Sequence, residues 1–280
     1  MRRIILTLIL SAFIASPAIA FDFGNTPEHQ VKRLLESQVR YANKTNFKKF
    51  ISTYDEKYVN ADGLNIEDYS SLVKDTWDSY NNIKYGIKIK SISVNENKAT
   101  AELFETAHAD ISISEAYGGE LKSESDSIYY LEKINGKWKV VSDSALSETT
   151  SMLYGQAKNL DIKLSVPNEI NANTEYTASL EFTPPEDTVA VASITADKVE
   201  YPQKSPKEVF RNLPEDNILE RLFTANNSGA DEYVIASIGL TKTQVCDLSI
   251  QLSLIGFGYK IKRVNVISEN NEVCENEQNK

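Results

Sequence analysis

One histidine in the first half of the chain stands close to two acids. His108 falls in a segment of alternating polarity, with Glu105 and Asp110 near it in sequence. An imidazole or a carboxylate held in a pocket could act as a base or as a helper in proton transfer. A lone histidine in a strand is more often a surface residue or a hydrogen-bonded structural one. Both interpretations stand, with His108 and Glu105 as weak catalytic candidates.

The same half of the chain is rich in rings with polar tips. Tyr54, Tyr58, Trp77 and Tyr129 could line a cavity and bind a small ligand, because each ring offers apolar surface together with a hydrogen-bonding atom. They could equally be packing residues of a small domain.

The chain has two cysteines, Cys246 and Cys274, both near its end. In an oxidising compartment an isolated pair favours a disulfide, which would contribute roughly 3–4 kcal/mol by closing the loop. There is no Cys-x-x-Cys pattern, and the two histidines lie far from the cysteines, so we expect no metal and no cofactor.

An N-terminal export signal is indicated by the first twenty residues. Arg2 and Arg3 precede an apolar run, and Ala18-Ile19-Ala20 matches a signal-peptidase site. We therefore expect the general secretory route and a periplasmic or extracellular protein. The run is too short to span a bilayer comfortably, and we expect no membrane span in the mature chain.

Composition narrows the range of partners. The chain has 30 basic and 40 acidic residues, a net charge of −10, and 41% hydrophobic residues. This balance is typical of a globular protein. Its acidity argues against nucleic acid and anionic membrane surfaces as partners.

Apolar spacing predicts three helices followed by strands. Thr26-Pro27 begins the first helix, residues 47–58 hold the second, and Asn65 caps the third. From residue 83 the period changes to two, with Ile87 and Ile89 between lysines. An antiparallel meander then runs to about residue 146, with a hairpin turn at Asn135-Gly136. We expect the sheet to curve around the helices and enclose a cavity.

Residues 27–147 resemble the nuclear transport factor 2-like superfamily, which includes ketosteroid isomerase and the polyketide cyclases (SnoaL-like proteins). The resemblance rests on three short segments, Asn46–Tyr54, Tyr58–Gly63 and Asn135–Asp143. It covers less than half of the chain. It implies a cone-shaped α+β fold with a pocket, and it implies no particular activity because the superfamily mixes enzymes with non-catalytic binders.

Carried over residue by residue, the resemblance gives a mixed result. Asp62 falls where ketosteroid isomerases place their general base, whereas Gln38 falls where they place an electrophilic phenol, and Tyr41 is offset by almost one turn. Asp62-Gly63 is also an ordinary turn pair. Asp62 is therefore a weak catalytic candidate.

The second half has the pattern of short strands separated by turns. After a connector over residues 148–159, residues 160–280 predict an antiparallel, immunoglobulin-like β-sandwich. Helical spacing is seen for Val209, Leu213, Ile218, Leu219 and Leu222, so residues 205–223 are interpreted as a helical insertion. The predicted fold class is an α+β cone of three helices on a curved antiparallel sheet over residues 21–147, followed by this sandwich.

These predictions favour an exported, non-catalytic protein of a bacterial envelope that binds a small apolar ligand or an envelope protein. A small lyase or isomerase with Asp62 as its base is the first alternative. A structural envelope component, with homodimerisation through the open face of the meander sheet, is the second.

Overall fold

The computed structural model describes residues 26–80, 82–114, 117–246 and 249–268. The predicted leader, residues 1–20, lies outside the described residues, and so does Cys274. Export and the disulfide with Cys246 therefore stay predictions. Within the described part of the chain, no helix is long and apolar enough to cross a membrane.

Three helices open the fold: α1 (Pro27–Ala42), α2 (Phe47–Ile51) and α3 (Ile66–Ser79). Side chains cap them as the sequence predicts, because Thr26 accepts a hydrogen bond from the His29 amide, and Asn65 accepts from the amides of Glu67 and Asp68. The second helix is much shorter than predicted and ends at Ile51. From there to Asn65 the chain runs in turns and isolated bridges.

Strands dominate the rest of the chain and lie in two sheets. The large sheet has nine strands, with eight in the order β1-β2-β3-β4-β12-β11-β8-β9 and every neighbouring pair antiparallel, and β6 pairs parallel with β12. The small sheet has the order β10-β7-β5. The strands are β1 (Lys84–Asn95), β2 (Lys98–Ser114), β3 (Tyr117–Ile134), β4 (Lys137–Gly155), β5 (Lys163–Ser165), β6 (Glu169–Asn171), β7 (Glu175–Glu181), β8 (Thr188–Lys198), β9 (Arg211–Asn212), β10 (Ile218–Thr224), β11 (Glu232–Cys246) and β12 (Ser249–Ile267).

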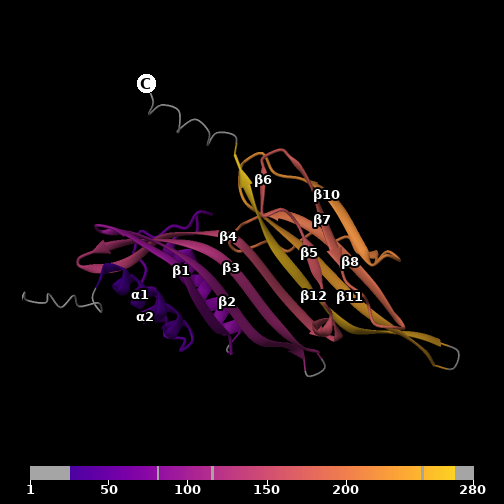
Figure 1. The fold of residues 1–280 in the computed structure, drawn as a ribbon. Helices are drawn as coiled ribbons and strands as arrows, with labels where there is room; N and C mark the ends of the chain where they lie inside the picture. The colour runs from indigo at the N-terminus through magenta and orange to yellow at the C-terminus, as the bar shows by residue number, and fades with distance from the viewer. Residues whose placement is uncertain (1–25, 81, 115–116, 247–248, 269–280) are drawn as a thin grey trace, which may run out of the picture.

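The predicted fold class is wrong, because the chain is mostly strand and its main feature is one large antiparallel sheet. Strands make up 56% of the described residues, and one sheet runs through both halves, so a three-helix cone followed by a separate immunoglobulin-like sandwich does not describe the fold. The cause is the pairing of β4 with β12, in which Thr149–Gly155 faces Gly256–Lys262. The segment interpreted as a connector is the end of β4 followed by a 3-10 turn, Gln156–Asn159. Figure 1 shows the continuous sheet, with α1 and α2 near one end and the small sheet at the other.

The helical insertion predicted for residues 205–223 is also wrong. This segment contains β9 and β10, and β10 pairs with β7. Leu219 and Phe223 pack on the core, whereas Leu222 between them is 60% exposed, which is the alternation of a strand. Pro206 and Pro214 interrupt the segment, and a proline in a helix interior removes a hydrogen bond and clashes with the preceding turn.

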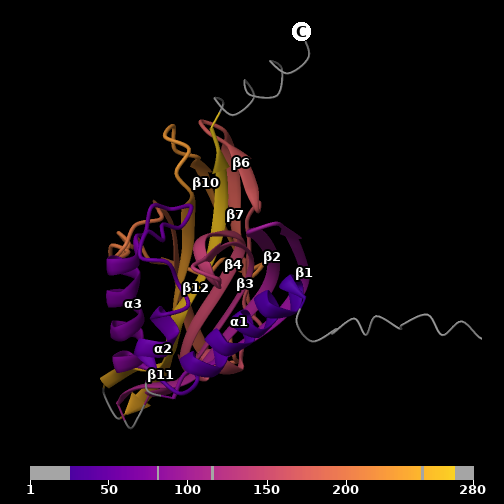
Figure 2. The ribbon, with the colours of Figure 1, turned by 90° about the vertical axis from the view of Figure 1, so that its left-hand side faces the viewer.

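Two hydrophobic cores lie on opposite faces of the large sheet. The first core lies between the helices and β1–β4, and the second lies between the small sheet and β8, β11 and β12. Successive residues of a strand point to opposite faces. In β4, accordingly, Tyr154 belongs to the first core while Leu153 packs against the second. Figure 2 shows the helices and the small sheet from the side.

An ion pair joins the two halves on the helix side of the sheet. Arg263 of β12 donates to both carboxylate oxygens of Asp62, at 2.9 and 2.6 Å, and also to Asp231. Its side chain is 1% exposed, and that of Asp62 is 10% exposed. Tyr201, from the loop after β8, donates to Asp62 at 3.2 Å. The turn before α3 is therefore fixed to the C-terminal half.

Candidate functional site

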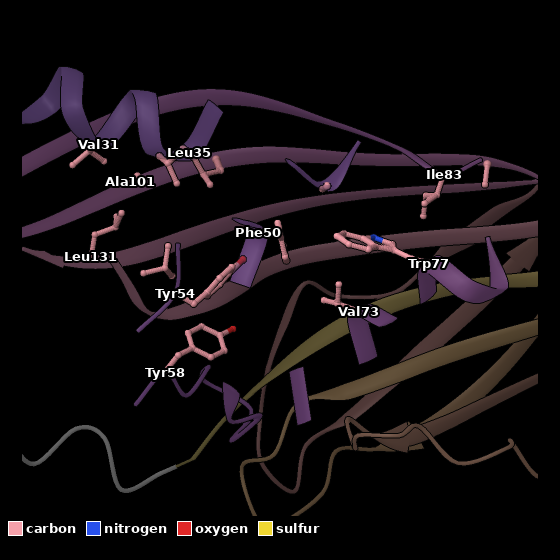
Figure 3. Close-up of a cluster of buried hydrophobic side chains, with 14 of the residues drawn as sticks. Val31, Leu35, Phe50, Tyr54, Tyr58, Val73, Trp77, Ile83, Ala101 and Leu131 are labelled. Carbon is pink, nitrogen blue, oxygen red and sulfur yellow. The ribbon is translucent and has the colours of Figure 1, made fainter. Parts of the chain in front are cut away.

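A cavity of about 250 Å³ lies between the helices and the inner face of the sheet. Leu35 and Gln38 of α1, Phe50 of α2, and Val73 and Trp77 of α3 form the wall on the helix side. Strands β1, β2 and β3 form the opposite wall. Figure 3 shows the labelled side chains of the helices and the loop after α2 gathered over the strands. The wall residues of α1 and of α3 point into the cavity together, because residues three and four apart on one helix share a face.

Aromatic rings make up much of this wall and contact one another. The Tyr54 and Tyr69 rings have centroids 5.1 Å apart, and their hydroxyls are hydrogen-bonded at 3.1 Å. The Phe50 and Trp77 rings lie 5.7 Å apart, and the Trp77 indole N–H donates to the Tyr85 hydroxyl at 3.1 Å. The polar tips are therefore satisfied within the protein, and the ring faces remain as apolar surface.

Of the four rings that the sequence indicated as ligand contacts, three line the cavity: Tyr54, Trp77 and Tyr129. Tyr58 does not. It lies behind Tyr54, with the two ring centroids 5.1 Å apart, and is 1% exposed. Tyr58 is therefore a packing residue, and contact of the other three with a ligand stays a prediction.

Glu105 is the carboxylate of the cavity wall. It comes from β2, where Leu103 and Glu105 point inward in alternation with Phe104. The Tyr129 hydroxyl donates to Glu105 Oε1 at 3.0 Å. Burial raises the pKa of Glu105, and the hydrogen bonds from Ser127 and Tyr129 oppose that rise in part. This carboxylate can accept hydrogen bonds from a bound molecule or hold a positive charge.

A second acid lies beside the cavity without lining it. Asp143 of β4 accepts a hydrogen bond from the Tyr58 hydroxyl at 2.6 Å. Burial raises the pKa of Asp143 to about 6, and the hydrogen bond from Tyr58 acts in the opposite direction. The nearby carboxylates of Glu105 and Asp62 raise this pKa further, while Arg263 lowers it.

The structure separates the other catalytic candidates from the cavity. Asp62 is held by Arg263 and Tyr201 and does not line the cavity. His108 lies on the outer face of β2, where its Nε2 is 2.9 Å from Glu120 Oε1 and its side chain is 47% exposed. Of the three weak candidates, only Glu105 reaches the cavity. Within the described residues, no group of three or more His, Cys, Asp or Glu side chains could hold a metal ion.

Sequence reasoning did not name three further wall residues as ligand contacts: Gln38, Tyr69 and Tyr85. A signal for Tyr69 was present, because it shares a helix face with Val73 and Trp77 at spacings of four and eight. Gln38 donates to the Thr53 hydroxyl at 2.9 Å, and nothing local in the sequence marks that partner.

No family model matches the chain, and no curated protein matches it. Solved structures that resemble part of it include Bd1075 of Bdellovibrio bacteriovorus, at 16% identity over 41% of this chain and 38% of that one, with a TM-score of 0.36. An NTF2-like protein with a cystatin-like fold from Novosphingobium aromaticivorans matches at 12% identity over 41% of this chain and 78% of that one (TM-score 0.34). A type 2 hexachlorocyclohexane dehydrochlorinase (LinA) matches at 12% identity over 41% of this chain and 81% of that one (TM-score 0.35). Each of these likenesses reaches about two fifths of this chain.

Proposed function

We propose that this chain is an exported binding protein for one small, largely apolar molecule, held between the three helices and strands β1–β3. The observation that carries this proposal is the cavity itself, with its volume of about 250 Å³ and its aromatic wall. Side chains from six elements converge on it, yet they leave it unfilled. Protein interiors are otherwise packed at the density of organic crystals, with few voids larger than a water molecule.

The volume sets the size of the ligand. An apolar cavity of about 150 Å³ is sufficient to bind benzene. The larger volume here fits a molecule of one substituted ring or two fused rings, at the small end of ligand sites. Apolar wall residues such as Leu35, Val73 and Leu103 would supply most of the affinity through buried area.

A binding role fits the position of the acids better than catalysis by Asp62 does. A general base must come within hydrogen-bond reach of the proton that it removes. The Asp62 carboxylate is occupied by Arg263 instead and does not line the cavity. Export remains part of the proposal because of the leader pattern at residues 1–20.

The chain offers a direct optical test, because it has only two tryptophans, Trp77 and Trp138, and only Trp77 lines the cavity. In the variant Trp138→Phe, Trp77 is the sole tryptophan. Titration of this variant with 2-naphthol, a neutral two-ring probe, should quench the Trp77 emission saturably with one site. In Trp77→Phe, the emission of Trp138 should change only in proportion to added probe.

A pair of matched substitutions on β2 locates the binding event. Ala107→Phe places a ring in the cavity and should abolish saturable quenching. His108→Phe introduces the same ring one residue away, on the outer face, and should leave quenching unchanged. Equal binding by both variants, or no saturable quenching of Trp77 by the probe, would overturn the proposal.

A further inference from the structure

The cavity combines many rings with a single charge. Its ring-bearing residues are Phe50, Tyr54, Tyr69, Trp77, Tyr85 and Tyr129. Glu105 is the one acid among the described residues of the wall, and these include no lysine, arginine or histidine. The interior therefore offers negative charge and π-faces and no positive group.

Among the residues that the structure describes, no lysine, arginine or histidine is a partner of Glu105. The groups that act on it are the hydroxyls of Ser127 and Tyr129 and a second carboxylate, Glu148 of β4. The lysines of the neighbouring strand β1, Lys84, Lys88 and Lys90, alternate with its inward residues and point outward. Among them, Lys90 pairs with Asp126 at 2.5 Å on the outer face. A buried carboxylate without a counter-ion is costly, so the site favours either protonation of Glu105 or a positive charge brought by a ligand.

The rings next to this carboxylate favour the second possibility. Tyr129 is in direct contact with Glu105, and Tyr54 and Tyr69 lie close enough for its charge to affect their hydroxyls. The face of an aromatic ring attracts a cation, and several rings around one site form the cages that hold quaternary ammonium groups. Rings and one carboxylate are poor ligands for a metal ion, which needs several oxygen, nitrogen or sulfur donors.

We propose that the ligand of this cavity is an organic cation, an alkylammonium group attached to a small apolar or aromatic body, with the ammonium between Glu105 and the surrounding rings. This inference rests on the proposed function and names the chemical class of the molecule bound. The acidic surface of the chain, with its net charge of −10, would also attract cations from solution.

The protonation state of Glu105 links this binding to pH. The titratable groups that face Glu105 are Tyr129 on β3, Glu148 and Asp143 on β4, and Tyr54 and Tyr69 on the helix side. None of them is cationic, so the site attracts a cation only while its carboxylates are ionised. Affinity for a cation should fall as pH decreases through the raised pKa of Glu105, and affinity for a neutral molecule should not.

Two probes of the same shape separate charge from size. Phenyltrimethylammonium and tert-butylbenzene differ only in that a positively charged nitrogen replaces a neutral carbon. Both would be titrated into Trp138→Phe, with the emission of Trp77 as the signal. The cation should bind roughly tenfold more tightly, or better, at neutral pH.

Charge-neutral substitutions at two glutamates on β2 complete the test. Glu105→Gln should remove the preference for the cation and leave the affinity for tert-butylbenzene within about twofold. Glu102→Gln changes an exposed acid on the outer face of the same strand and should keep the preference.

The outcomes distinguish this inference from the proposed function. If tert-butylbenzene binds as tightly as the cation, or if Glu105→Gln keeps the preference, the inference is wrong while the cavity remains a binding site. If 2-naphthol binds and neither isostere does, the inference is also wrong. If none of the three probes quenches Trp77 saturably, the proposed function itself fails.

Discussion

Replacing the buried acid Asp143 by its neutral amide should stabilise the protein at alkaline pH. In Asp143→Asn the amide oxygen can still accept the hydrogen bond that the Tyr58 hydroxyl donates at 2.6 Å. What disappears is the negative charge that burial disfavours. The variant therefore resembles the protonated form of Asp143 at every pH.

The magnitude follows from the pKa of Asp143. Burial raises it from 3.8 to about 6 in the folded protein. The folded state thus binds more protons than the unfolded state between these two values, so stability decreases as pH rises through this window. The full penalty is present above about pH 7 and amounts to roughly 3 kcal/mol, at 1.36 kcal/mol for each pH unit between the two pKa values. Below about pH 4 the carboxyl is neutral in both states, and the penalty vanishes.

Thermal unfolding followed by circular dichroism at a series of pH values would measure this. At about pH 8, Asp143→Asn should unfold roughly 6–12 °C above the wild type, given 2–4 °C per kcal/mol for a chain of this size. The two curves should converge near pH 4. Asp110→Asn, the same change at an exposed position of β2, should shift the midpoint little at any pH. A variant that is no more stable than the wild type at about pH 8 would refute the reasoning.

Three further substitutions have defined expectations. Arg263→Leu leaves the largely buried Asp62 without its cationic partner, so the free energy of unfolding in a denaturant titration should fall by about 3–5 kcal/mol. Much of this loss should be recovered in the double variant Arg263→Leu/Asp62→Leu. A loss below about 1 kcal/mol in the single variant would contradict the prediction. Gly155→Ala places a Cβ on a residue with φ +58° and against a backbone carbonyl of β12, so it should lower the free energy of unfolding by more than about 1 kcal/mol. An unchanged unfolding midpoint would show that the contact between β4 and β12 adapts to the added carbon. Tyr129→Phe removes a hydrogen-bond donor to Glu105 and should raise the pKa of that carboxyl further. The loss of phenyltrimethylammonium affinity should therefore be greater at about pH 6 than at about pH 8. An equal loss at both pH values would count against Glu105 as the group that holds the cation.

Local signals in the sequence were sufficient to place several elements. Asn135-Gly136 predicted a hairpin, and both residues have positive φ values, of 50° and 77°, in the turn between β3 and β4. Thr26 and Asn65 predicted helix starts because a capping side chain needs only its own next few residues. Such features depend on contacts within one turn of chain, so they can be inferred without knowledge of the fold.

The spacing of apolar residues did not distinguish a helix from a strand where it fitted both periods. Leu219 and Leu222 lie three apart, which suits a helix, yet in β10 they fall on opposite faces. What decides between the two is the partner strand β7, some forty positions earlier in the chain, and β-propensity depends strongly on such neighbours. The prolines at 206 and 214 were the local warning against a helix.

The cavity was only partly predictable for a related reason. Helical spacing brought Trp77 to the inner face, and strand alternation brought Tyr129 to the opposite wall. Tyr58 appeared equivalent in sequence, but the short α2 ends before it and turns it toward Asp143. The pairing of Asp62 with Arg263 joins residues 201 positions apart, and no pattern in one sequence indicates a contact of that range.

The pairing of β4 with β12 limits how this protein can be truncated. These two strands contribute alternate side chains to two hydrophobic layers on opposite sides, so neither layer is complete in a truncated chain. A fragment that ends near residue 150 would expose unpaired backbone amides and carbonyls along β4, and such an edge strand is prone to aggregation. The halves should therefore melt in one transition, as a single cooperative body.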